Sequence, residues 1–189
     1  VARRTVGDMV IEGGRIVPAK IDAQQTAVHG LSWFATYVEG LRQMRGWAGR
    51  LDQEGRLDRL ERLMLQAAYG EYLNQLQGGI AISQVEIVRP ADLGISESDL
   101  AAFRTEPVLT LMASGNTEKV RAEIAGLIEH GDFGHAGLDD ETLQLIRDQF
   151  RRFAEEQVQP HAHDWHLKDQ LIPIGIVEQM AELGVFGLT

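Results

Sequence analysis

Three histidines lie close together in the C-terminal third of the chain, and their type and spacing could hold a metal ion. They are His161, His163 and His166. On a helix, His163 and His166 would share a face, and neutral imidazoles at that spacing can chelate a metal. The alternative is a polar surface turn directly after Pro160. Because no second cluster of ligands is visible, we favour the surface turn and assign no metal ligand.

The carboxylates and serines of the chain do not lie in sequence motifs that are typical of catalytic sites. Acidic residues are abundant, but no pair is marked as the acid and base of a cleft. No nucleophile elbow, phosphate-binding loop or dinucleotide fingerprint is present. The serines considered as nucleophiles are Ser83, Ser96, Ser98 and Ser114. The segment from Asp52 to Gly55 lacks the ligand spacing of a calcium loop and fits a turn. We therefore assign no catalytic residue.

The composition excludes several classes of protein. The 189 residues carry a formal net charge of −10 and no basic stripe, which disfavours a nucleic-acid partner. The absence of cysteine excludes disulfides and thiol catalysis, and it is compatible with a cytoplasmic protein. No signal peptide and no apolar run of ~20 residues is visible, so we expect no membrane segment.

Two long helices should dominate the first half of the chain. One is predicted from Asp22 to Trp47, with Gly46 and Gly49 weakening its end, and one from Leu57 to Gln77. The stripe of the first helix is Val28, Leu31, Phe34, Ala35, Val38 and Leu41. The face of the second is Leu57, Leu60, Met64, Ala67 and Ala68. The short connection between them predicts an antiparallel pair.

The segments on either side of this pair should be less regular. Residues 1–20 are expected to be an irregular arm in which Gly13 and Gly14 could close a hairpin between residues 9–11 and 15–17. Gly78-Gly79 should end the second helix. Residues 80–90 should then be extended or form a buried loop.

Short helices follow, separated by turn and cap residues. Ser96 can cap a helix over residues 97–103, and Pro107 should start another through Met112. Asn116 or Thr117 should cap a longer helix that ends at Gly131. Its buried face is predicted to be Val120, Ile124, Leu127 and Ile128. The glycine-rich segment 131–137 is the best candidate for a domain boundary.

The last part of the chain should also be helical. Asp139, Asp140 and Glu141 place negative charge at a helix start, where the dipole favours it. The core face of this helix should be Leu143, Ile146, Phe150 and Phe153. Arg151 with Glu155, and Arg152 with Glu156, can pair on its solvent side. A further helix should follow Pro173, so the whole chain is predicted to be mainly α.

The order of these C-terminal elements resembles a known family. The chain has Pro160 and Ala162, then a helix after Pro173, and last the run from Met180 to Leu188. This order resembles the N-terminal helical domain of the flavin-dependent acyl-CoA dehydrogenases. The resemblance implies that residues 135–189 are the incomplete start of that domain. The parts of the family that cover the flavin and the thioester would follow Thr189.

A second segment resembles the C-terminal helix bundle of the same family. Residues 75–81 are similar to a Gln-x-x-Gly-Gly-x-Gly turn that approaches the flavin adenine across a subunit interface, where glycine allows close approach. Here Ala81 replaces the last glycine, and Gly78-Gly79 alternatively just ends a helix. We interpret the turn as a relic and assign no cofactor-binding residue. Residues 21–134 would then be a helical extension like that bundle, as in the bacterial methylsuccinyl-CoA dehydrogenases of this family.

The resemblance implies a function for the intact protein. A glutamate base would remove the α-proton of an acyl-CoA while flavin N5 takes the β-hydride, giving the enoyl-CoA. FAD would be bound outside this chain, and electrons would leave through an electron-transfer flavoprotein. The extension would cover the surface at which relatives form tetramers, leaving a homodimer. The alternative is a non-catalytic helical interaction module derived from the same fold.

Overall fold

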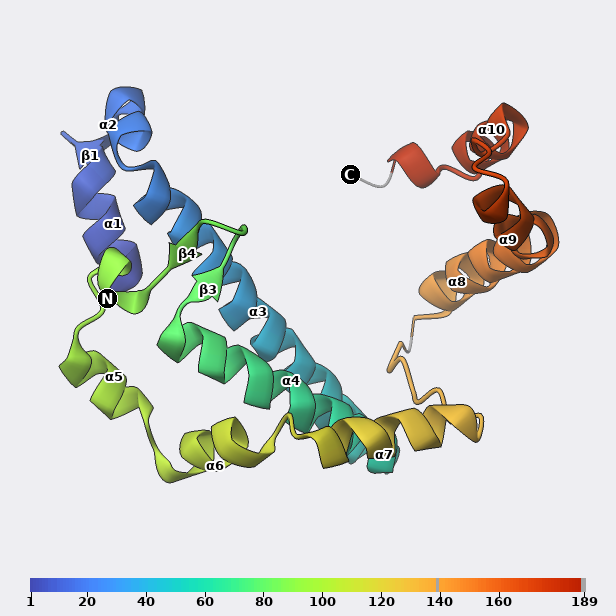
Figure 1. Ribbon diagram of the computed structural model, residues 1–189, viewed down its shortest axis with the longest axis horizontal. Helices are drawn as coiled ribbons and strands as arrows, with labels where there is room; N and C mark the ends of the chain where they lie inside the picture. Colours follow the sequence, from blue (N-terminus) through green and yellow to red (C-terminus); the bar gives the residue numbers. More distant parts are fainter. Residues whose placement is uncertain (139, 188–189) are drawn as a thin grey trace. The chain divides into compact units, whose positions relative to one another are not determined.

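The computed structural model describes residues 1–138 and 140–187, and it forms two compact units that divide after Gly137. Both are mainly helical (Figure 1), so the predicted fold class is confirmed. The first unit contains α1 (Ala2–Val10), β1 (Ile11–Glu12), β2 (Arg15–Ile16), α2 (Pro18–Ala23), α3 (Gln25–Gln53), α4 (Arg59–Gly78), β3 (Ile80–Ala81), β4 (Ile87–Val88), η1 (Pro90–Leu93), α5 (Glu97–Phe103), α6 (Glu106–Ser114) and α7 (Glu118–Glu129). The second contains α8 (Glu141–Phe153), the π-helical turn η2 (Ala154–Val158), α9 (Gln159–Leu167), α10 (Ile174–Glu182) and η3 (Val185–Gly187).

Helices α3 and α4 form the predicted antiparallel pair and lie side by side (Figure 1). The hydroxyl of Tyr69 on α4 donates to the carbonyl of Leu41 on α3 at 2.8 Å. Helix α3 runs past Gly46 and Gly49, although a helical glycine costs ~1 kcal/mol relative to alanine. Leu51 in its last turns is fully buried, and that burial outweighs the cost.

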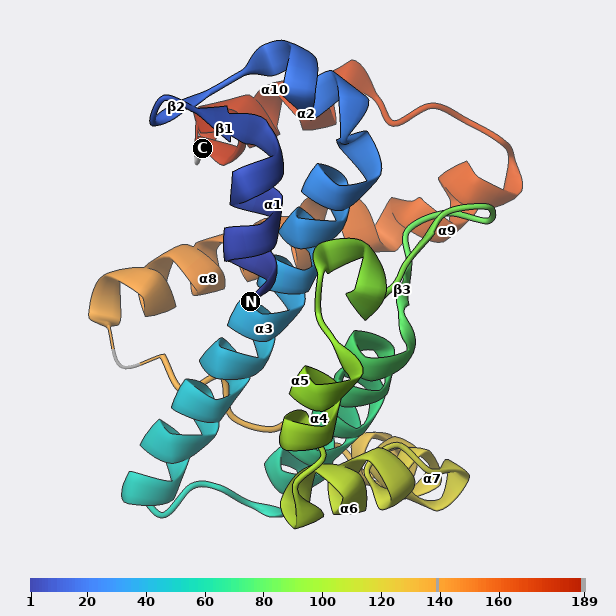
Figure 2. The ribbon, with the colours of Figure 1, turned by 90° about the vertical axis from the view of Figure 1, so that its left-hand side faces the viewer.

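The buried face of α4 differs from the predicted one. Leu60 is 1% exposed, as predicted, but Leu63, which was not predicted, is also 1% exposed, and Met64, predicted to be in the core, is 40% exposed. The helix packs against α3 on one side and against α6 and α7 on another (Figure 2). A helix with neighbours on two sides buries a wider and rotated set of positions than a single stripe predicts.

The N-terminal residues are not an irregular arm. Helix α1 begins at Ala2, and Val6, 2% exposed, lies in the main core cluster. The other buried members of that cluster are Ala27, Phe34, Ile80, Val88 and Leu93. The predicted hairpin is present at Gly13-Gly14, but β1 begins at Ile11 because residues 9 and 10 belong to α1.

The segment after α4 is a short antiparallel hairpin in which Ile80 pairs with Val88. Its second strand packs on α3 at Gly30, where an added Cβ would overlap the Val88 side chain. This glycine allows the hairpin to approach the helix directly. Residues 80–81 and 87–88 are therefore extended, as predicted, while an exposed bend joins them and Pro90 already belongs to η1.

The predicted helix starts are also found. The Ser96 hydroxyl accepts from the backbone N–H of Asp99, and Thr117, rather than Asn116, accepts from that of Val120. In the second unit, Asp140 accepts from two backbone N–H groups and caps α8. Asp139 lies outside the described residues.

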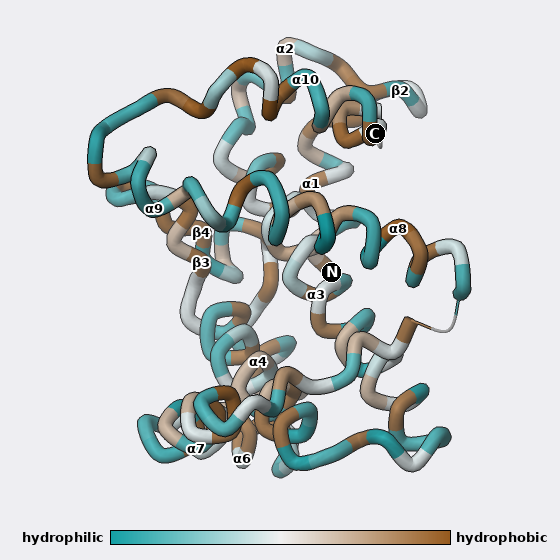
Figure 3. Tube along the Cα trace, turned by 90° about the vertical axis from the view of Figure 1, so that its right-hand side faces the viewer, coloured by the Kyte–Doolittle hydropathy of each residue, from teal (hydrophilic) through white to brown (hydrophobic). Residues whose placement is uncertain are grey.

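The second unit continues from α8 through the π turn into α9. The predicted pairs Arg151–Glu155 and Arg152–Glu156 are not among the ion pairs of the described residues. A π turn has a wider period than an α-helix, so residues four apart no longer align across it. Along α8, hydrophobic and hydrophilic residues alternate (Figure 3).

Candidate functional site

The histidine run lies on a helix, so the favoured surface turn is wrong. Pro160 is in the first turn of α9, where a proline needs no N–H partner. All three histidines are exposed, and the ring of His161 lies 5.6 Å from that of Trp165. Within residues 1–138 and 140–187, no group of three His, Asp or Glu is placed to hold a metal ion.

The second unit contains an apolar concavity of about 790 Å³ that sequence reasoning missed. Aromatic and aliphatic side chains from its helices line it, with His166 and Gln170 as its polar members. The main lining residues are Phe150, Phe153, Trp165, Ile176 and Met180. The predicted core face of α8 was Leu143, Ile146, Phe150 and Phe153. Only Phe150 and Phe153 of that face line the concavity.

None of the described residues of the second unit is buried. Leu145 on α8 is 71% exposed and Ile174 on α10 is 71% exposed. Isolated large apolar side chains at a surface are ordinary, but a contiguous apolar concavity marks a surface that another element covers. The second unit therefore presents a helical face that is ready to pack against further protein.

The Gly78-Gly79 turn in the first unit is in close contact with the β3–β4 hairpin that follows it. Gly79 has a φ of +119°, and a Cβ there would lie 3.1 Å from both Ile87 Cγ2 and Val88 O. The guanidinium of Arg89 donates to the carbonyl of Gly78 at 3.1 Å. These contacts explain why glycine stands at this helix end. The space beside Gly79 is therefore taken up by residues of the hairpin itself.

The carboxylates with shifted pKa values have structural roles. Hydrogen bonds from Gln75 and Asn116 lower the pKa of Glu71, and a bond from Arg59 lowers the pKa of Glu123. The serine cap at Ser96 lowers the pKa of Asp99. All three shifts favour the ionised carboxylate, whereas a general acid or base near neutral pH needs a raised carboxyl pKa.

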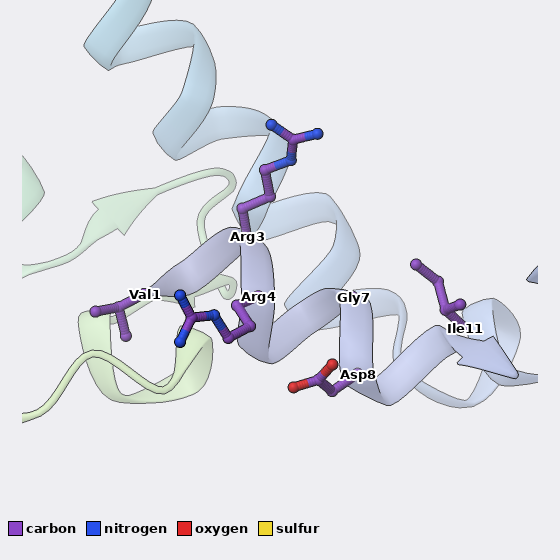
Figure 4. Close-up of a pocket in the computed structure, with 6 residues that line it drawn as sticks. All are labelled: Val1, Arg3, Arg4, Gly7, Asp8 and Ile11. Atoms are coloured by element: carbon purple, nitrogen blue, oxygen red, sulfur yellow. The ribbon is translucent and has the colours of Figure 1, made fainter. Parts of the chain in front are cut away.

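A shallow concavity at the N-terminus is also not organised as a site. It is lined by residues of α1 and its flanks, and the side chains of Arg3 and Arg4 point away from each other (Figure 4). Asp8 lies one turn further along the same helix. Two cations that diverge cannot hold one anion between them.

Comparison with known proteins relates both units to one family. Residues 140–189 match the model of the acyl-CoA dehydrogenase N-terminal domain. The chain is a relative of the acyl-CoA dehydrogenases. Along its full length it is 51% identical to the N-terminal part of (2S)-methylsuccinyl-CoA dehydrogenase from Cereibacter sphaeroides. It spans about a third of the length of that curated relative.

The match to the dehydrogenase domain falls on the second unit, whose helices bury none of their described residues. The first unit lies outside the domain match, yet the relative contains it too, because the alignment covers the whole chain. Among the described residues, no helix combines the length and apolar character that crossing a bilayer requires.

Proposed function

We propose that this chain is the N-terminal part of an FAD-dependent acyl-CoA dehydrogenase that oxidises (2S)-methylsuccinyl-CoA to mesaconyl-CoA in the cytoplasm. The observation that carries the proposal is the 51% identity along the whole chain, including the first unit, which the domain match does not cover. Electrons would pass to an electron-transfer flavoprotein. The FAD, when bound, would accept the hydride, and it would be held by residues outside this chain.

We propose that residues 21–134 are a helical extension and that residues 135–189 begin the dehydrogenase domain. Residues 1–20, which were predicted to be an arm, belong to the first unit, because α1 packs in its core. The unburied apolar face of the second unit supports the assignment of residues 135–189, because such a face requires a covering layer. In the proposed enzyme that layer is the rest of the dehydrogenase domain.

The activity is tested with the purified full-length protein. We expect a visible flavin spectrum that bleaches when (2S)-methylsuccinyl-CoA is added without oxygen, and a much smaller effect with butyryl-CoA. A flavin that only butyryl-CoA reduces would contradict the proposed substrate. A protein that binds no flavin would favour the second candidate, a non-catalytic helical interaction module.

We further propose that the first unit covers the surface at which related subunits would form a tetramer, so that the enzyme is a homodimer. The resemblance of the α3–α4 pair and the Gly78-Gly79 turn to the family's C-terminal bundle supports this. Deletion of residues 1–137 should convert the dimer into a larger assembly in light scattering. A soluble dimer after the deletion would contradict the capping role.

A further inference from the structure

His135 is held from several sides by side chains of α3, α4 and the turn between them. Its backbone N–H donates to Glu61 Oε1 at 2.7 Å, and its carbonyl accepts from Trp47 Nε1 at 3.1 Å. Arg56 lies 3.2 Å from Nδ1 of the imidazole, and Asp58 Oδ2 lies 3.6 Å from Nε2. A guanidinium can only donate, so this geometry places the ring proton on Nε2, facing Asp58.

Glu61 is unusual because its side chain is fully buried. A buried carboxylate is destabilising unless hydrogen bonds compensate for the lost water. Its Oε1 accepts from His135, while Oε2 has no hydrogen-bond partner among the described residues. Glu61 stands in the first turn of α4, so its bond to His135 joins that turn to the segment before the second unit.

The segment Gly131–Gly137 is here called the link. It has a glycine at each of the two positions where its backbone comes closest to α3 and α4. Gly134 has a φ of +68°, and a Cβ there would lie 3.0 Å from Glu61 Oε1. Gly137 has a φ of +62°, and a Cβ there would lie 3.0 Å from Trp47 Cδ1. Both positions combine a left-handed backbone with close approach, and only glycine satisfies both requirements without strain.

We propose that Trp47, Arg56, Asp58 and Glu61 form a clamp that fixes the link on the first unit. The clamped segment ends at Gly137, and Asp140 already caps α8. The clamp therefore orders the link as part of the first unit, up to its end at Gly137.

The clamp does not depend on the proposed capping role. Its contacts lie entirely within residues 47–137, and they can be measured whether or not the protein is a dehydrogenase or a dimer.

The clamp is tested by hydrogen exchange of the link amides in the full chain. Trp47→Phe keeps a ring and removes the N–H donor, and Glu61→Leu removes the acceptor. We expect at least about fivefold faster exchange at residues 134–136 in each variant, the effect of losing a bond worth ~1 kcal/mol. Amides of α3 and α4 should remain protected.

Two further variants separate the clamp from a general loss of packing. Trp33→Phe is the matched control, since the Trp33 N–H donates to His29 on the same helix, away from the link. It should leave the exchange of the link unchanged. Glu61→Gln retains an acceptor oxygen and should keep the link protected. Unchanged exchange of the link in Trp47→Phe would overturn the proposal, even if Glu61→Leu fails to fold.

Discussion

The two units use the same kind of helix with opposite results. The first unit buries leucines of both long helices almost completely, such as Leu51 and Leu60. In the second unit, three helices and a π turn bury none of their described residues. Amphipathic helices form a core only when a second layer covers their apolar face. The difference indicates that the first unit carries both layers and that the second carries one.

The sharpest way to break this comparison is to remove the same side chain from each unit. Leu60→Ala should lower the free energy of unfolding by ~2–5 kcal/mol, because Leu60 is 1% exposed and its removal leaves a cavity. Leu145→Ala should change it by less than ~0.5 kcal/mol, since Leu145 is 71% exposed. Urea unfolding of the full chain measures both. Similar losses in the two variants would remove the distinction between the units.

A smaller effect tests how closely the helices of the first unit approach. In Gly70→Ala, the new Cβ would lie 2.6 Å from the Asn116 nitrogen and 2.7 Å from Gly115 Cα, so backbone must move. We expect the free energy of unfolding, measured with urea, to fall by ~1–3 kcal/mol. Gly40→Ala on α3 is the control, because its Cβ meets open space and alanine favours a helix by up to ~1 kcal/mol. Equal stability of both variants would show that α4 and the turn between α6 and α7 are not closely packed.

The smallest effect is a pH dependence within the first unit. Folding lowers the pKa of Glu71 below its usual 4.5, chiefly through the bond from Gln75 and then that from Asn116. A lowered pKa means that the ionised group stabilises the fold above pH 4.5, and that this contribution is lost as the pH falls through the folded pKa. The stability difference between wild type and Glu71→Gln should therefore shrink below pH 4.5. A difference that grows in acid would reverse the assigned sign.

Helical periodicity was sufficient to find the long elements but not their neighbours. The spacing of Phe34 and Leu41 predicts α3, and both are buried. Met64 was placed in the core wrongly, because a sequence does not show how many helices surround α4. Helix α1 was missed because nine residues form a helix only with tertiary support, which Val6 supplies from the core.

The candidate sites were harder to predict for the same reason. The role of Glu61 depends on His135, which is 74 residues away, and no local motif connects them. The apolar concavity likewise requires α8, α9 and α10 to be placed together. The assignment of no catalytic, cofactor-binding or metal-binding residue to this chain stays a prediction.

The most direct measurement compares hydrogen exchange in the 189-residue chain with that in the proposed full-length enzyme. We predict that α3 and α4 are protected in both proteins. Helices α8, α9 and α10 should exchange rapidly in the short chain and at least 100-fold more slowly in the enzyme, because the rest of the dehydrogenase domain then covers their apolar face. Equal protection of these three helices in the two proteins would contradict the account.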